Sequence, residues 1–259
     1  MLFQIKSYLQ FLWNSKNEHA VHSPFVFNLI TKCFYDTKSK PEYQVLKEYR
    51  NSLLENKNTI EVTDFGVGSK VFKSNTRQIA KIAKTAGISP KRAELLFRIT
   101  NYFQPSTILE IGTSLGLATS ALALGNPKAS IITLEGCTNT LSITKNQLQL
   151  FNLENIKCVV SEFSSYFSTS NFQLLPSNLI FFDGNHSKTA TLKYFELLLS
   201  STTNDSVWIF DDIHWSSEME EAWEIIKKHP KVRVTIDTFQ WGLVFFRKEQ
   251  QKEHFVIRT

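Results

Sequence analysis

The sequence has few cysteines, and their spacing excludes two kinds of stabilised site. Cys33, Cys137 and Cys158 are the three cysteines among 259 residues, and they stand far apart. An odd, scattered set supports neither a disulfide framework nor a metal site built on a CxxC pair. We therefore expect a protein of the reducing cytoplasm.

Long apolar runs and long basic runs are also missing. No stretch reaches the roughly 20 apolar residues that a membrane-spanning helix needs. The first 14 residues are apolar, but Lys6 interrupts them, and they lack the basic region and the small-residue cleavage site of a signal peptide. The net charge of +5 comes from scattered Lys and Arg residues. We expect this charge to solvate the surface, and a nucleic-acid partner is disfavoured.

Glycine is scarce, and the two common phosphate-binding glycine motifs are absent. The nine glycines form neither GxxxxGK[ST] nor GxGxxG. The segment DFGVGSK, residues 64–70, shares three letters with a kinase motif, but no kinase catalytic-loop sequence accompanies it. We expect a tight turn there, with a lid over the main site as the alternative.

The chain is organised around residues 107–124, TILEIGTSLGLATSALAL. A β-branched run at 107–111 is typical of a strand buried in a parallel sheet. Gly112 and Gly116 free the next turn from crowding by side chains, so a ligand can approach the backbone. The following apolar positions predict a helix that ends at Gly125 before Pro127.

Further strands follow this unit, and helical patterns separate them. The expected strands are residues 107–111, 129–134, 156–160, 179–182 and 207–210, then an antiparallel hairpin of 232–236 with 243–246, and a last strand near 253–257. Strands that alternate with helices predict an α/β fold with a mostly parallel sheet and right-handed crossovers. Ser217 and Glu220 have capping-box spacing before a helix with apolar residues at i, i+3, i+4 and i+7.

The N-terminal 88 residues predict a mainly helical extension or lid on a domain of residues 89–259. Apolar side chains cover one side of a helix at residues 2–13. We expect this helix to dock on the domain or on a second subunit, which allows a homodimer through the N-terminal helices. A helix lying in a membrane plane is the weaker alternative, because cationic residues are few.

Polar residues follow the predicted strands, and they should meet at one edge of the sheet. In a parallel sheet the ligand lies beyond the carboxyl ends of the strands. The converging residues are Glu110, Gly112, Glu135, Ser161, Glu162, Asp183, His186, Asp211, Asp212 and His214.

The spacing of this set separates two cofactor classes. Glu135 lies 23 residues beyond Gly112, where a carboxylate can accept hydrogen bonds from both ribose hydroxyls. An NAD pyrophosphate would need glycines at the positions of Ser114 and Leu117. A nucleoside cofactor without phosphates is therefore favoured.

The segment LEIGTSLGLATSALA resembles the first motif of class I S-adenosylmethionine-dependent methyltransferases, in the LEIGT form of the catechol and caffeoyl-coenzyme A O-methyltransferases. The resemblance covers about residues 89–248 and implies a Rossmann-like, doubly wound, seven-stranded mixed sheet that is mostly parallel and has a terminal antiparallel hairpin. By the same resemblance, the methionine part of S-adenosylmethionine would be surrounded by Glu110, Gly112, Thr113, Ser114 and Gly116. Glu135 would bind the ribose, and Ser161, Glu162 and Phe163 would line the adenine edge.

The resemblance also implies an acidic site, because metal-dependent members place carboxylates after the fourth and fifth strands. Asp183 and the pair Asp211 and Asp212 match those positions, and oxygen ligands suit Mg²⁺. The same Asp183 would border the cofactor. His186, His214 or Lys188 could act as the base. The segment Asp183-Gly-Asn-His186 is similar to a group of small-molecule methyltransferases with a DGxH motif, in which the histidine matters more.

The sequence thus predicts S-adenosylmethionine-dependent transfer of a methyl group to a hydroxyl of a small molecule, with a divalent metal or a histidine activating the acceptor. Asp183, His186 and His214 are the candidate catalytic residues. An RNA or protein methyltransferase is one alternative. A non-catalytic scaffold of the same fold is the other.

Overall fold

The computed structural model describes residues 2–65, 68, 72–168 and 178–259. Contacts divide the chain into two compact units. Unit 1 combines Met1–Tyr35 with Gln173–Thr259, and unit 2 is the continuous segment Asp36–Phe172. The border expected between residues 88 and 89 falls inside unit 2, between two of its helices.

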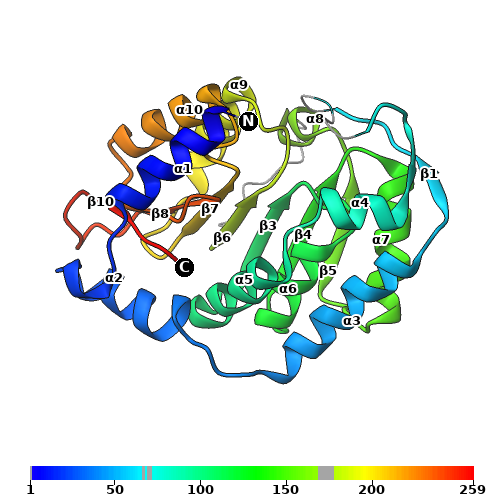
Figure 1. Ribbon diagram of the computed structural model, residues 1–259, viewed down its shortest axis with the longest axis horizontal. Helices are drawn as coiled ribbons and strands as arrows, with labels where there is room; N and C mark the ends of the chain where they lie inside the picture. The colour runs from blue at the N-terminus through cyan, green and yellow to red at the C-terminus, as the bar shows by residue number, and fades with distance from the viewer. Residues whose placement is uncertain (1, 66–67, 69–71, 169–177) are drawn as a thin grey trace. The chain divides into compact units, whose positions relative to one another are not determined.

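Three parallel strands form the sheet of unit 2. They are β3 (Thr107–Ile111), β4 (Ser130–Glu135) and β5 (Ile156–Val160). β4 lies between the other two, with Ile111 opposite Leu134 and Glu135 opposite Val160 (Figure 1). This register brings the C-terminal ends of the three strands to the same edge, as the alternation of strands and helices predicted.

Helices connect and cover these strands. Those of unit 2 are α3 (Pro41–Glu55), α4 (Ile79–Thr85), α5 (Pro90–Phe103), α6 (Leu117–Gly125), α7 (Thr138–Leu150) and α8 (Phe163–Ser168). α5 begins at Pro90, because the Ser89 hydroxyl accepts a hydrogen bond from the Arg92 amide at 3.3 Å. α3 and α5 both contact α6, so the helix that follows the glycine turn is packed on its outer side.

A short antiparallel pair in unit 2 was not predicted. β1 (Thr59–Glu61) pairs with β2 (Thr76–Gln78), although the N-terminal 88 residues were predicted to be mainly helical. Three-residue strands carry too few residues to show alternation. Most of the turn predicted at 64–70 lies outside the described residues, apart from Asp64, Phe65 and Gly68.

Unit 1 holds five strands in the order β10-β8-β9-β7-β6. Their bounds are β6 (Leu179–Phe182), β7 (Val207–Asp211), β8 (Val234–Asp237), β9 (Trp241–Phe245) and β10 (Glu253–Val256). β6 is parallel to β7, β9 is antiparallel to both β7 and β8, and β10 is parallel to β8. The predicted hairpin and the last strand are confirmed. With β10, these strands and the three parallel strands of unit 2 number eight among the described residues, against seven predicted.

The helices of unit 1 come from both ends of the chain. They are α1 (Leu2–Asn14), α2 (Pro24–Leu29), α9 (Lys188–Leu198) and α10 (Ser217–Lys228), with short turns of other helix types at Glu18–Ala20, Ile30–Phe34 and Leu199–Ser201. α10 packs on α9. The predicted cap of α10 was one residue late, because Ser216, which is extended, accepts the Met219 amide hydrogen bond at 3.2 Å. No helix in the described ranges combines the length and apolar character of a membrane span.

Candidate active site

The turn after β3 depends on backbone conformations that most residues avoid. Gly112 has φ 103°, and Gly116, which caps α6, has φ 77°. Ser114 adopts φ 47° without being glycine, a conformation that costs free energy. The amides of Gly112 and Thr113 both donate to the carbonyl of Leu134, at 3.0 and 3.1 Å. The turn is thereby joined to the end of β4.

Side chains from two helices donate hydrogen bonds to the backbone of the same turn. The Tyr49 hydroxyl of α3 donates to the carbonyl of Leu115 at 3.0 Å, and the Thr144 hydroxyl of α7 donates to the carbonyl of Ser114 at 2.6 Å. A Cβ on Gly116 would lie 2.7 Å from the Thr144 methyl carbon. Sequence reasoning missed Tyr49 and Thr144, because nothing in their spacing links them to residues 112–116.

Glu135 is held against the glycine turn. One carboxylate oxygen, Oε2, accepts a hydrogen bond from the Ser114 amide at 2.9 Å, and Oε1 accepts one from the Cys137 amide at 2.9 Å. Burial raises the pKa of Glu135, and the amides of Cys137, Ser114 and Gly136 act in the opposite direction. The carboxylate has a fixed orientation at the C-terminal end of β4, and oxygen atoms with two acceptor positions each retain capacity for a ligand's hydroxyls.

Glu110 is more deeply buried than Glu135 and is completely shielded from solvent within unit 2. Its Oε2 accepts hydrogen bonds from the hydroxyls of Thr119 on α6 and Thr133 on β4, both at 2.6 Å. Its Oε1 has no hydrogen-bond partner among the described residues. Burial raises the pKa of Glu110 to about 7, despite these two hydrogen bonds. Glu110 thus joins three elements around the turn.

The predicted adenine-edge residues follow β5, next to the end of β4. The Ser161 amide donates to the carbonyl of Glu135 at 3.0 Å. The carboxylate of Glu162 accepts the Ser165 hydroxyl at 2.7 Å in the first turn of α8, whose first residue is Phe163. The structure therefore brings the backbone of Ser161 to that of Glu135. The Glu162 side chain accepts a hydrogen bond at the start of α8.

A second acidic group lies in unit 1 at the ends of β6 and β7. Ligand atoms of Asp183, His186 and Asp211 all lie within 4.8 Å of one another. The His186 Nε2 atom is 3.7 Å from Asp183 Oδ1, and Asp211 is only 6% exposed. The parallel register of the two strands, with Phe182 opposite Phe210, explains why the aspartates that follow are neighbours.

This group differs from the predicted metal ligands in one member. Asp183 and Asp211 are brought together as predicted, whereas Asp212 is not part of the group and His186 is. Two residues near this group have positive φ angles. Asp212 has φ 54°, and Asn185, in the β6–α9 loop, has φ 51°. An imidazole beside two carboxylates fits a borderline cation such as Zn²⁺ better than Mg²⁺, which prefers oxygen ligands alone.

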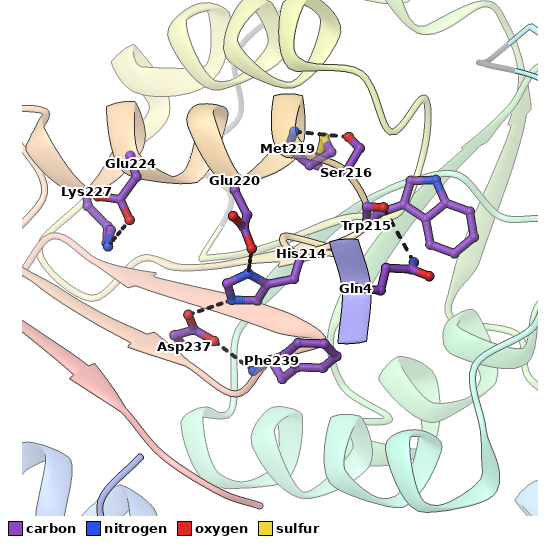
Figure 2. A network of polar contacts seen from close by, with 10 residues as sticks. All are labelled: Gln4, His214, Trp215, Ser216, Met219, Glu220, Glu224, Lys227, Asp237 and Phe239. Atoms are coloured by element: carbon purple, nitrogen blue, oxygen red, sulfur yellow. Dashed lines mark hydrogen bonds and ion pairs between the residues drawn. The ribbon is translucent and has the colours of Figure 1, made fainter. Parts of the chain in front are cut away.

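His214 occupies a network that leaves neither ring nitrogen free (Figure 2). Nδ1 lies 2.7 Å from Glu220 Oε1, and Nε2 lies 2.8 Å from Asp237 Oδ2. Burial lowers the pKa of His214, but the hydrogen bonds and charges of Asp237 and Glu220 outweigh it and raise the pKa above 6.5. The ring also stacks on Phe239, with centroids 5.1 Å apart. This geometry favours a charged residue that ties α10 to the β8–β9 turn, rather than a base.

Known proteins resemble this chain both in a family model and in the fold. The model of a family described as a methyltransferase domain matches residues 109–213. The fold is similar to that of an O-methyltransferase from Bacillus cereus in complex with SAH, with 17% identity and a TM-score of 0.57 over 86% of this chain and 97% of that one.

Two further solved structures have the same fold. A putative caffeoyl-CoA O-methyltransferase from Staphylococcus aureus is 16% identical, with a TM-score of 0.57 over 86% of this chain and 97% of that one. A putative O-methyltransferase from Klebsiella pneumoniae is 15% identical, with a TM-score of 0.58 over 85% and 94%. The resemblance found in the sequence and the Rossmann-like fold that it implied are confirmed.

Proposed function

Residues 109–213 match the model of a methyltransferase domain, and from this premise we propose that the chain transfers the methyl group of S-adenosylmethionine to a hydroxyl oxygen of a small molecule. The supporting observation is the contact between Glu135 and the glycine turn, in which the Ser114 amide donates to the carboxylate at 2.9 Å. A carboxylate fixed beside an open backbone turn suits a ribose that is joined to a chain without phosphates.

Residues of unit 2 would hold the cofactor. Glu135 would accept the hydrogen bonds of the two ribose hydroxyls, while its contacts with backbone amides keep the carboxylate oriented. The turn of residues 112–116 would lie along the methionine part. Glu110 would act on this turn through Thr119 and Thr133. Because the sulfonium is already an activated donor, positioning would supply much of the rate acceleration.

Residues of unit 1 would act on the acceptor. Asp183, His186 and Asp211 offer two carboxylates and one imidazole, which fit a divalent cation. A bound cation would lower the pKa of an acceptor hydroxyl. His186 lies 3.7 Å from Asp183 and is partly exposed, so it can instead take the hydroxyl proton itself while Asp183 stabilises the imidazolium. We assign the candidate base to His186 rather than His214, whose two nitrogens are occupied.

Calorimetry with S-adenosylhomocysteine tests the cofactor proposal. Wild-type protein should bind it, Glu135→Ala should weaken binding at least about tenfold through the lost ribose contacts, and the exposed Glu154→Ala is the matched control. Absence of binding by the wild-type protein would leave the non-catalytic scaffold as the better description. Transfer of labelled methyl to a panel of phenols, catechols and sugars would then identify the acceptor. Transfer to RNA or protein instead would move the proposal to the corresponding alternative.

Titration with Mn²⁺, Mg²⁺ and Zn²⁺ separates the two modes of activation. If a cation is held, Asp211→Asn should abolish its binding and the exposed Asp205→Asn should not. If turnover survives chelation, loss of activity in His186→Asn should identify the imidazole as the base.

The predicted homodimer through the N-terminal helices stays a prediction. Four apolar side chains of α1, spaced along the helix, are more than half exposed, namely Leu2, Ile5, Leu9 and Trp13. The molar mass in solution, measured by light scattering, tests whether a second copy covers them.

A further inference from the structure

The described part of the segment 59–78, which we call the β1–β2 arm, is attached to the end of β4 and the start of α7. The side-chain amide of Asn139 donates to the carbonyl of Glu61 at 2.8 Å, and the Thr63 amide donates to the Cys137 sulfur at 3.4 Å. Asn139 and Cys137 follow Glu135 closely, so the arm lies against the loop that begins with the ribose carboxylate.

This attachment places the ring of Phe65 in the space that a side chain at Gly136 would fill. A Cβ built on Gly136 would lie 2.5 Å from Phe65 Cδ2 and 2.9 Å from Cε2. The ring therefore covers the backbone of the residue directly after Glu135. Even so, Phe65 is 53% exposed, so part of the ring remains accessible to a ligand.

Charged neighbours support this position. Asp64 forms an ion pair with Arg77 of β2 at 3.2 Å, so the residue before Phe65 is anchored across the arm. The charge of Asp64 also contributes to raising the pKa of Glu135, after burial, which is consistent with a short distance between the two carboxylates. Phe65 and Glu135 thus belong to one local cluster in unit 2.

We propose that Phe65 forms one wall of the purine subsite and stacks on the adenine of the cofactor. The proposal rests on the function proposed above. If Glu135 binds the 2′ and 3′ hydroxyls, the base is attached to the adjacent ribose carbon and must lie within a few ångströms of residues 135–137. An exposed aromatic ring on Gly136 offers the base a flat apolar surface, and such stacking is tolerant of small displacements.

The proposal gives a role to a segment that the sequence could describe only as a turn or lid. Gly136 carries no side chain, and the arm supplies the missing apolar surface from a distant part of the chain. The ring of Phe65 offers no hydrogen-bonding group. It would therefore recognise the flat shape of the base rather than its hydrogen-bonding pattern. The ribose and the amino-acid part would contact other residues.

Calorimetry on the full-length protein tests the proposal with S-adenosylhomocysteine and with S-ribosylhomocysteine, the same molecule without the base. Phe65→Ala should weaken S-adenosylhomocysteine binding about five- to hundredfold, the range for loss of one base–aromatic stack. Binding of S-ribosylhomocysteine should change less than about twofold, and Phe65→Tyr should retain wild-type affinity for both.

Phe72→Ala is the matched control, because Phe72 lies under Arg77 on the same arm. This substitution removes a side chain of the same size without uncovering Gly136. It should leave the ratio of the affinities for S-adenosylhomocysteine and S-ribosylhomocysteine unchanged. If Phe65→Ala binds both ligands as the wild-type protein does, or loses affinity for both equally, the stacking role is wrong while the proposed function stands. Failure of the wild-type protein to bind S-adenosylhomocysteine would overturn both.

Discussion

The buried carboxyl of Glu110 predicts a specific dependence of stability on pH. Burial raises its pKa from the usual 4.5 to about 7 in the folded chain. Below pH 4.5 the group is protonated in both states, and above pH 7 it is ionised in both. Between these values the folded state binds more protons than the unfolded state, so the free energy of unfolding falls as pH rises. Each pKa unit corresponds to about 1.4 kcal/mol, so this carboxyl should lower stability by about 2 to 3 kcal/mol between pH 5 and pH 8.

Glu110→Gln removes this titration while keeping the shape of the side chain. The difference in unfolding free energy between Glu110→Gln and the wild-type protein should therefore change by about 2 to 3 kcal/mol over that range, in favour of glutamine at high pH. Urea unfolding followed by circular dichroism measures it. All five tryptophans belong to unit 1, so tryptophan emission recorded in parallel identifies the transition of the other unit.

The same measurement on Glu154→Gln, at an exposed position of unit 2, is the control. Its difference from the wild-type protein should be flat with pH. A constant difference for Glu110→Gln between pH 5 and pH 8 would show that the buried carboxyl ionises normally, and the reasoning from burial would be refuted.

Three further predictions concern other parts of the chain. Gly116→Ala should destabilise unit 2 by about 2 kcal/mol or more, because φ 77° strains any other residue and the new Cβ meets Thr144, and unchanged urea unfolding would contradict this. His214→Gln should destabilise unit 1 by about 2 kcal/mol at pH 6, measured by tryptophan emission. Since the pKa of His214 is raised, the stabilisation is present below pH 6.5 and is lost as pH rises through the folded pKa, so a deficit equal at pH 6 and pH 9 would exclude a charged histidine. Asp211→Asn should abolish the rise in melting temperature that a bound Zn²⁺ gives the wild-type protein, whereas Asp205→Asn should retain it.

The strands and the main glycine turn could be predicted because their patterns are local. Residues 107–111 form a strand, as expected, and the turn predicted after it is present, with positive φ at Gly112 and Gly116. The capping of α10 was displaced by one residue because Ser216 and Ser217 are adjacent and only the backbone of Ser216 is extended. Neighbouring candidates of this kind cannot be separated by sequence spacing.

The contacts between distant segments could not be predicted. Tyr49 reaches Leu115 and Phe65 covers Gly136, and each pair is separated by more than 60 residues. His214 is a further example, because its position after a strand suggested a base, whereas Asp237, from the next strand, occupies one of its nitrogens. The position of a residue at a strand end predicts where the residue lies, but it does not predict which neighbours occupy its hydrogen-bonding atoms.

The two ends of the chain meet in unit 1, and this sets an order for synthesis. The Lys16 amide donates to the carbonyl of Val256 at 2.8 Å, and Tyr8 and Phe11 of α1 pack on Phe239. α1 therefore leaves the ribosome more than 200 residues before its partners Trp215 and Phe239, while the continuous segment 36–172 is complete much earlier. We expect ribosome-bound chains stalled before residue 239 to show a protease-resistant core from residues 36–172 and a cleavable α1.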